Sequence, residues 1–486
     1  MAPEARGARS PFLVTEDWWA VWIGLFIFLL GLLKLTGTDV LGWAVKTHTW
    51  LQLSRALSPV SEVYQGLPGA VSLILTYAFL TVLLSLGVAA MGGRVGRFIL
   101  GFTLIFGLTY FCWMVGNYAY IAATPDQLAK LKIGWSLRLT GESGFIVSLM
   151  AGLLIGNFWP GLAQFLREAT RPEWFVKTAI VILGAKVGLY ALQSAGLAAQ
   201  VVLRGFCAML EAYLIYWPLV YFLARKYFKF TPEWAAPLAS GISICGVSAA
   251  IATGGAIKAR PIVPVIVSSL VIIFAVVELL ILPFIAQVGL YKEPMVAGAW
   301  MGLAVKTDGA AAASGAMVDA LIRARAATAL GVQWQEGWML MTTTTVKVFI
   351  DIFIALWAFL LAFIWTWKIE KREGERVAAA DIWQRFPKFV IGYAALFLLV
   401  LLIGAAMGQE GFKLLSSGVG QADAFRGIFF ALTFFTIGLM SNFKKLKEEG
   451  MGRLALVYLV CLFGFIIWIG LFISWVFFHG ITPPAA

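Results

Sequence analysis

Histidine and charged residues are scarce in this chain. Only two histidines occur, His48 and His479, and Asp, Glu, Lys and Arg together make up 13% of the 486 residues, against roughly 25% in soluble proteins. So few histidines leave no histidine-rich metal site to expect. The cysteines all lie inside apolar segments without CxxC spacing, which predicts neither a disulfide scaffold nor a zinc site. They are Cys112, Cys207, Cys245 and Cys461.

Catalytic and nucleotide-binding motifs are also missing. The sequence contains no Ser–His–Asp set, HExxH, P-loop or GxGxxG in a strand-to-helix context. We therefore expect no enzyme activity and no cofactor, and we expect any transport to be driven by an ion gradient rather than by ATP. Lys and Arg exceed Asp and Glu by 37 to 25. Because these cations lie in short loops between apolar runs, they favour orientation in a bilayer over nucleic-acid binding.

The chain is instead rich in long apolar runs, and 61% of its residues are hydrophobic. A bilayer-spanning helix needs about 20 mostly apolar residues, so the pattern predicts an all-α polytopic membrane protein. With the N-terminus in the cytoplasm, the inner loops carry about twice as many Lys and Arg residues as the outer loops. The thirteen predicted spans are 18–35, 69–91, 98–123, 143–159, 174–193, 198–224, 234–257, 262–286, 296–318, 337–367, 389–408, 425–441 and 454–478.

Two regions do not fit the simple pattern of spans and loops. Lys258 and Arg260 fall on the outer side in this count, so 234–257 is either a span or a re-entrant hairpin that changes the parity. Residues 36–68 carry Trp43, Trp50 and scattered charges, which indicates an interfacial helix and loop at the level of the lipid headgroups.

Two segments are built almost entirely of small residues, 241–259 (GISICGVSAAIATGGAIKA) and 302–318 (GLAVKTDGAAAASGAMV). This composition suits helices that unwind at mid-membrane and present free backbone groups to a ligand. The alternative is a tightly packed helix interface without a ligand. The two segments can be aligned from Gly241 with Gly302 to Gly254 with Gly315, as an internal repeat would require.

Ionisable residues at membrane depth are costly, so they usually face a cavity or a partner. Lys306 and Asp308 lie inside the second small-residue segment and are the strongest indication of a site. Lys347 and Asp351 stand four apart, and an internal ion pair explains them as well as a site does. Arg426 lies near a span end, where we expect it to snorkel towards the interface. The remaining candidates are Lys186, Glu211 and Glu278, each of which could bind an ion or simply pair with an opposite charge.

The segment 241–259 resembles the signature of the proposed sulfate exporter family, in which a similar Ile-Cys-Gly run precedes an alanine-rich stretch. Three further segments resemble helices of that family in order and spacing: VSLMAGLLIGNFWP at 147–160, FVKTAIVILGAKVGLYAL at 175–192 and FFTIGLMSNFKKLKEEG at 434–450. Lys186 stands where relatives carry a cation. The resemblance covers about 143–478, which divides the chain into a three-span extension (1–140) and a transporter core (141–486).

This resemblance implies a multi-pass inner (plasma) membrane protein related to the sodium/proton antiporter and bile-acid symporter superfamily. The implied fold has two inverted repeats with broken helices that cross near the bilayer centre, and the implied activity is export of sulfate or related oxyanions. Relatives commonly carry His-Glu followed by Gln where this chain has Lys306, Thr307 and Ala310. The coupling or the substrate of this chain is therefore expected to differ from that of typical members.

The sequence as a whole predicts a secondary active transporter for a small anion such as sulfate, sulfite or a sulfonate, coupled to protons or sodium. One alternative is a cation/proton antiporter on the same fold, and another is a membrane scaffold or sensor that transports nothing. The lipid bilayer is an expected partner, nucleic acid is not, and a homo-oligomer stays open. Predicted substrate-binding residues are Lys186, Ser243, Cys245, Gly246, Ser248, Lys306, Thr307 and Gly309; predicted ion-coupling residues are Glu211, Glu278 and Asp308.

Overall fold

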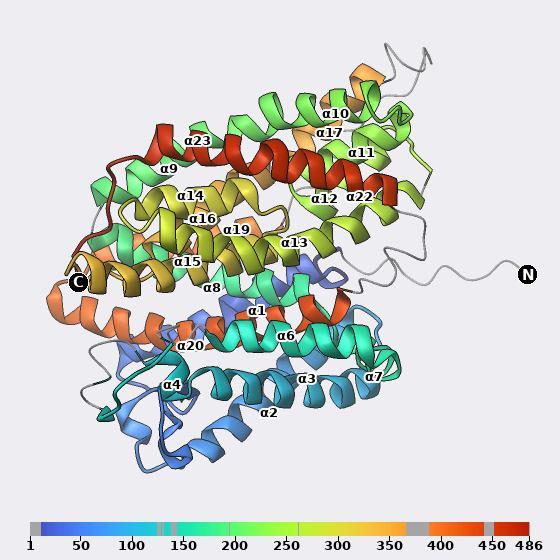
Figure 1. Cartoon of the computed structure of the whole chain (residues 1–486). Helices are drawn as coiled ribbons and strands as arrows, with labels where there is room; N and C mark the ends of the chain where they lie inside the picture. Colours follow the sequence, from blue (N-terminus) through green and yellow to red (C-terminus); the bar gives the residue numbers. More distant parts are fainter. Residues whose placement is uncertain are drawn as a thin grey trace, which may run out of the picture.

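The computed structural model describes residues 11–123, 128, 131–137, 143–193, 195–260, 262–365, 388–441 and 452–485. These residues form a bundle of helices that run along one common direction (Figure 1). The helices are α1 (Glu16–Leu32), α2 (Gly69–Ala90), α3 (Val95–Gly116), α4 (Ala119–Ala122), α6 (Ser143–Phe158), α7 (Pro160–Leu166), α8 (Pro172–Gln193), α9 (Ala195–Glu211), α10 (Trp217–Lys226), α11 (Pro232–Ser243), α12 (Gly246–Ala256), α13 (Ile262–Gly289), α14 (Pro294–Ala304), α15 (Asp308–Ala329), α16 (Trp338–Ile352), α17 (Ile354–Ile364), α19 (Lys388–Ala405), α20 (Gln409–Met440), α22 (Gly452–Cys461) and α23 (Ile467–Phe478).

The expected all-α polytopic architecture is confirmed in its main feature. Among the described residues, nine helices are long and apolar enough to cross a membrane, or ten if α6 and the following bent segment, at 114° to it, count as one span. The predicted count of thirteen spans is not confirmed. Two of the thirteen segments are broken instead of continuous: 234–257 forms the short helices α11 and α12, and 296–318 contains the short helix α14 and the first half of the 22-residue helix α15.

A small antiparallel sheet interrupts the helical pattern after α1. Strands β1 (Val45–Thr47) and β2 (Leu57–Pro59) pair with Val45 opposite Pro59. The interfacial helix expected within 36–68 is therefore wrong. Tertiary contacts contribute to this outcome, because the Val45 N–H donates to Thr76 Oγ1 on α2 at 3.0 Å. The segments that follow the two strands contain turns and the three-residue 3-10 helices η3 (Leu53–Arg55) and η4 (Glu62–Tyr64). We call the end of the bundle that carries this sheet the β end.

Helices α11 and α12 form a hairpin that enters and leaves the bundle at the end opposite the β end. Glu233, at the start of α11, accepts hydrogen bonds from the backbone N–H (2.8 Å) and Nε (3.0 Å) of Arg260, which follows α12. With 12 and 11 residues, the two arms are each about 17 Å long, roughly half of a 30 Å hydrocarbon core. The segment 234–257 is thus the re-entrant alternative.

Helices α14 and α15 form a second hairpin that starts and returns at the β end. Glu293, just before α14, accepts a hydrogen bond from Gly480 N–H at 3.0 Å. Trp334, after α15, forms a bridge with Ala485 of the same C-terminal tail. Extended backbone at Val305 and Thr307 separates the two helices, and the Thr307 side chain caps α15 by accepting from Ala310 N–H at 3.2 Å.

The tips of the two hairpins meet inside the bundle. Gly246, which opens α12 with a φ of +26°, lies so close to the second tip that a Cβ there would be 2.8 Å from the Lys306 carbonyl oxygen and 2.6 Å from Val271 Cγ1. A residue without a side chain is required at this position for both reasons. Two breaks that lie 62 residues apart in sequence are thereby brought into direct contact.

Helix α1 is an integral part of the bundle. It packs against α8, α19 and α20, and its Gly31 lies so close to Gly418 of α20 that a Cβ on either residue would come within 2.6 Å of the other's carbonyl oxygen. At the end opposite the β end, Lys177 of α8 pairs with Asp17 of α1 at 2.8 Å. The division of the chain near residue 140 stays a prediction. Helix α1, from the predicted extension, packs directly against helices of the predicted core.

Candidate functional site

The hairpin tips and α16 place three acidic or thiol side chains together in the middle of the bundle. Cys245, from the break between α11 and α12, donates a hydrogen bond from Sγ to Asp308 Oδ1 at 2.7 Å. Cys245, Asp308 and Asp351 of α16 present ligand atoms that all lie within 4.8 Å of one another. All three residues are buried, with exposed fractions of 2%, 4% and 1%. Chemically the cluster could hold a proton or a small cation.

Lys347 and Lys306 supply positive charge beside this cluster. Lys347, one turn before Asp351 on α16, donates from Nζ to the Ile244 carbonyl of the first hairpin tip at 3.0 Å. Lys306, 1% exposed, donates from Nζ to the Leu303 carbonyl and lies 4.5 Å from the ring centroid of Tyr216. Its predicted contact with a substrate stays a prediction.

The two predicted glutamates are also buried near the tips, at 3% exposure for Glu211 and 0% for Glu278. Glu278 of α13 accepts a hydrogen bond from the Lys306 backbone N–H at 3.1 Å. Glu211 ends α9 beside the π-helical segment η6 (Ala212–Tyr216), and its electrostatic partners include Tyr216 and Lys306. Both carboxylates therefore belong to the surroundings of Lys306.

The other predicted residues have structural positions at the tips. Ser243 is the last residue of α11 and is fully buried. Gly309 packs against Val176 of α8 and against Thr433 of α20, where an added Cβ would find atoms at 3.6 and 3.5 Å. Thr307 caps α15. The side chain of Ser248 and the basic loop 442–450 lie outside the part of the chain that the structure describes.

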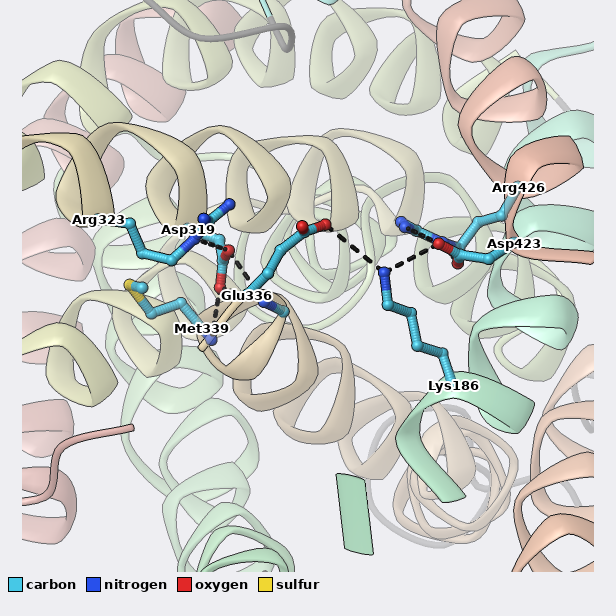
Figure 2. A network of polar contacts seen from close by, with 8 residues as sticks. Lys186, Asp319, Arg323, Glu336, Met339, Asp423 and Arg426 are labelled. Carbon is cyan, nitrogen blue, oxygen red and sulfur yellow. Dashed lines mark hydrogen bonds and ion pairs between the residues drawn. The ribbon is translucent and has the colours of Figure 1, made fainter. Parts of the chain in front are cut away.

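Lys186 lies at a different place, in a cavity of about 200 Å³ at the β end. It points between two carboxylates, Asp423 at 2.9 Å and Glu336 at 3.5 Å (Figure 2). Arg426 completes the group by binding Asp423 through Nε and, at 3.0 Å, through Nη2. The expectation that Arg426 snorkels is wrong, because its carboxylate partner one turn away on α20 holds it in the cavity. Aromatic residues line the rest of the wall: Tyr110, Trp113 and Phe145.

The loop before α16 brings Glu336 to this cavity. Asp319 of α15 accepts from the N–H groups of Gly337 and Met339 at 3.0 Å and thereby caps the N-terminus of α16. Attraction by Lys186 lowers the pKa of Glu336 and outweighs burial, which raises it. Glu336 is therefore ionised at neutral pH and holds the Lys186 ammonium as an anionic ligand would. Its side chain is 54% exposed, so it can be displaced.

The cavity and the hairpin tips belong to one three-helix group. Helices α8, α15 and α20 each contribute one residue to the cavity and one to the tip, ten residues apart. The pairs are Lys186 and Val176 on α8, Asp319 and Gly309 on α15, and Asp423 and Thr433 on α20. Ten helical residues correspond to about 15 Å. Small residues cover this stretch of α15, from Gly309 to Ala316, and they are buried in the described conformation. The cavity is closed towards the tip in this conformation.

Sequence reasoning did not assign five other charged residues to this cavity: Lys46, Asp319, Glu336, Asp423 and Arg426. Two of them, Asp423 and Arg426, stand three apart within one long apolar segment. That spacing is a recognisable signal, because such residues are neighbours on a helix face. Glu336 is in a loop where carboxylates are common, and nothing in its local sequence indicates that it reaches Lys186 of another helix.

Comparisons with known proteins identify relatives along most of the chain. The family described as conserved hypothetical protein 698 matches residues 101–457. A UPF0324 membrane protein of Nitrosomonas europaea is 43% identical over 475 residues, covering 97% of both chains. A UPF0324 membrane protein of Streptococcus agalactiae is 25% identical over 72% of this chain and 92% of its own. An uncharacterized protein of Archaeoglobus fulgidus is 50% identical over 30% of this chain and 88% of its own. No solved structure matches.

Proposed function

This chain belongs to the conserved hypothetical protein 698 family of UPF0324 membrane proteins, and from that premise we propose that it is a secondary active transporter for a small anion. The observation that carries the proposal is the meeting of two helical hairpins from opposite ends of the bundle. Non-helical backbone at membrane depth is tolerated only where protein or a cavity surrounds it. Broken helices of this kind form substrate and ion sites in secondary transporters.

The substrate class follows from the cavity at Lys186. Lys186 and Arg426 converge on one carboxylate, Asp423, while the exposed Glu336 occupies the remaining side of the ammonium group. A small oxyanion that displaces Glu336 would keep Lys186 paired and gain a second cation in Arg426. Sulfate, sulfite and small sulfonates have the size and charge for this exchange. From the cavity the anion would pass along the small-residue face of α15 to the N-termini of α12 and α15, whose free N–H groups favour negative charge.

The distribution of loop cations supports a cytoplasmic N-terminus in an inner membrane. The α11–α12 hairpin places Lys258 and Arg260 at the same end as Arg225 and Lys226, which follow one another at the end of α10. This removes the one exception to the charge bias in the sequence. In that orientation the β end, with the Lys186 cavity, faces outwards.

Uptake by purified protein in liposomes tests the proposal. We expect radiolabelled sulfate, sulfite or methanesulfonate to accumulate when a pH gradient or sodium gradient is imposed. Replacing Lys186 with Ala removes the charge that receives the anion, so K186A should raise the KM about tenfold, as expected for the loss of a charge-assisted hydrogen bond. E336Q should instead lower the KM, because the internal competitor loses its charge.

The matched control is K292A, which removes an exposed lysine beside the start of α14. It should leave uptake unchanged. Uptake by K186A equal to that of the wild type would refute the role of the cavity. Absence of flux of every tested ion in the wild type would favour the non-transporting scaffold or sensor.

One observation favours a second candidate, a cation/proton antiporter. Four carboxylates and only two lysines are buried around the hairpin tips, namely Glu211, Glu278, Asp308 and Asp351 with Lys306 and Lys347. An excess of buried negative charge suits cation exchange. Sodium-driven proton release from liposomes that is lost in D308N but unaffected by K186A would support this candidate over anion transport.

A further inference from the structure

We propose that Asp308 and Asp351 together form a proton-binding site that closes on Cys245 of the opposite hairpin tip, with Lys347 as its fixed counter-charge. The inference deepens the proposed function by naming the coupling ion and by adding Asp351 to the site. It rests on the arrangement of the buried groups, and a readout other than transport tests it.

Asp308 has a hydrogen-bond donor, whereas Asp351 beside it has none among the described residues. Asp308 Oδ1 already accepts the Cys245 thiol hydrogen. Neither carboxylate oxygen of Asp351 accepts a hydrogen bond from a donor in the described part of the chain, although the residue is 1% exposed. A buried carboxylate without a donor is costly as an anion. Its cost falls when it carries a proton, which it can then share with a neighbouring carboxylate.

The surrounding charges support one bound proton. Lys347 interacts with both carboxylates and can neutralise one negative charge. Lys177 of α8 interacts with Asp308 but is already held by Asp17 at 2.8 Å. The other titratable groups that interact with the two aspartates are neutral or negatively charged. They are Cys245, Tyr213 and Glu173, which act on Asp351, Asp308 or both. With one carboxylate protonated, the charge of Lys347 balances that of the other carboxylate, and the cluster is neutral.

A metal ion is the competing occupant, because two carboxylates and a thiol can bind one. Lys347 opposes it, since a permanent ammonium group beside the cluster repels a divalent cation, and more strongly in a buried site than in water. A proton has no such conflict, because it removes charge from one carboxylate and leaves the lysine paired with the other.

The site also connects the hairpins to one end of the bundle. Val176 of α8 contacts Gly309, the residue after Asp308. On α8, Lys177 is the residue after Val176, and Glu173 lies about one turn before Val176. Glu173 reaches the end opposite the β end, with a side chain that is 38% exposed. A proton released at Asp308 therefore has titratable groups between itself and that end, whereas the anion cavity lies at the other end.

A hydrophobic carbodiimide, which couples to protonated carboxyl groups in apolar surroundings, tests the site on full-length protein in lipid nanodiscs. We expect dicyclohexylcarbodiimide to label Asp308 or Asp351, detected by mass spectrometry of the peptides, and the labelling to fall at least tenfold as the pH is raised. D351N should reduce labelling of Asp308, because one carboxylate then pairs with Lys347 alone. Asp39, which is partly buried and paired with Lys34, serves as the control carboxyl and should stay unlabelled.

Two results would overturn the proposal. One is the absence of label on both aspartates across the pH series. The other is one equivalent of Zn²⁺ or Mn²⁺ retained in equilibrium dialysis by the wild type and lost in D351N. The thermal unfolding midpoint of D351N, measured beside that of the wild type, controls for misfolding of the variant. Labelling without anion uptake would refute the anion transporter but leave the proton site standing.

Discussion

At the scale of single residues, local sequence found the charges at the tips but not their partners. Lys306, Asp308, Lys347 and Asp351 stand out because ionisable residues are rare in apolar segments. Their contacts join the break at Cys245 to α15 and α16, and no local pattern encodes such a long-range approach. For the same reason the sequence indicated Lys186 but not its pairing with Glu336, which lies 150 residues away.

Asp39 is the residue whose removal should weaken the β end most clearly. Its carboxylate binds Lys34 at 2.6 Å, Ser61 Oγ at 2.6 Å, Gly42 N–H at 2.9 Å and Gln421 Nε2 of α20 at 2.9 Å. We expect D39N to lower the free energy of unfolding by about 2 kcal/mol, since it removes the charge from several hydrogen bonds. Thermal unfolding in detergent measures this effect, and E62Q, at an exposed glutamate nearby, should leave the midpoint unchanged.

The same residue sets a pH dependence. Burial raises the pKa of Asp39, but the hydrogen bonds from Lys34 and Ser61 and the charge of Lys34 outweigh it and lower the pKa below the usual 3.8. The stability that Asp39 contributes is therefore present above pH 3.8 and is lost as the pH falls through the lowered value. The difference in unfolding midpoint between wild type and D39N should shrink below that pH. A difference that grows on acidification would contradict this assignment.

At the scale of elements, composition predicted that the small-residue segments are broken but not how they run. A broken helix that crosses the membrane and a hairpin that returns have the same glycine and alanine content. The contacts of Glu233 with Arg260 and of Glu293 with Gly480 decide between them, and both are long-range. The sheet at 45–59 was missed similarly, because strands of three residues depend on Thr76 of α2 and on each other.

Gly246 provides the test of the contact between the hairpins. G246A should destabilise the protein by about 2 kcal/mol, because its Cβ would collide with Val271 and with the Lys306 carbonyl and because its φ is positive. The unfolding midpoint measures the loss. G464A, in the π-helical segment η8 (Leu462–Ile466), where an added Cβ meets nothing within 4 Å, is the matched control. Equal midpoints for the two variants would show that the tips do not pack as described.

At the scale of the whole molecule, the membrane character follows from sequence, whereas the division into extension and core stays a prediction. The family match begins at residue 101, yet the Nitrosomonas europaea relative aligns over 97% of the chain. The backbone contact between Gly31 and Gly418 explains why α1 is not a detachable addition. Sequence could not reveal it, because a glycine in an apolar helix does not indicate which helix it touches.

The orientation of the two hairpins is a prediction for the intact protein in cells. Single cysteines in place of Glu233 and Arg260 should react with a membrane-impermeant maleimide from one side of the membrane, and cysteines in place of Glu293 and Glu336 from the other. Each hairpin then has both ends on one side. Labelling of E233C and R260C from opposite sides would instead require a helix that crosses between them.

The short distance between the Lys186 cavity and the hairpin tips has an electrical consequence. A membrane voltage falls mainly across whatever material separates the two aqueous compartments. In the orientation that we propose, water entering the Lys186 cavity would bring the outer compartment to about 15 Å from Asp308. The field is therefore concentrated on the stretch between the cavity and the tips. A charge that moves only a few ångströms there feels a large share of the applied voltage, each full crossing being worth about 2.3 kcal/mol per 100 mV. In the proposed transporter, small shifts of the hairpins would thus be enough to make turnover sensitive to voltage.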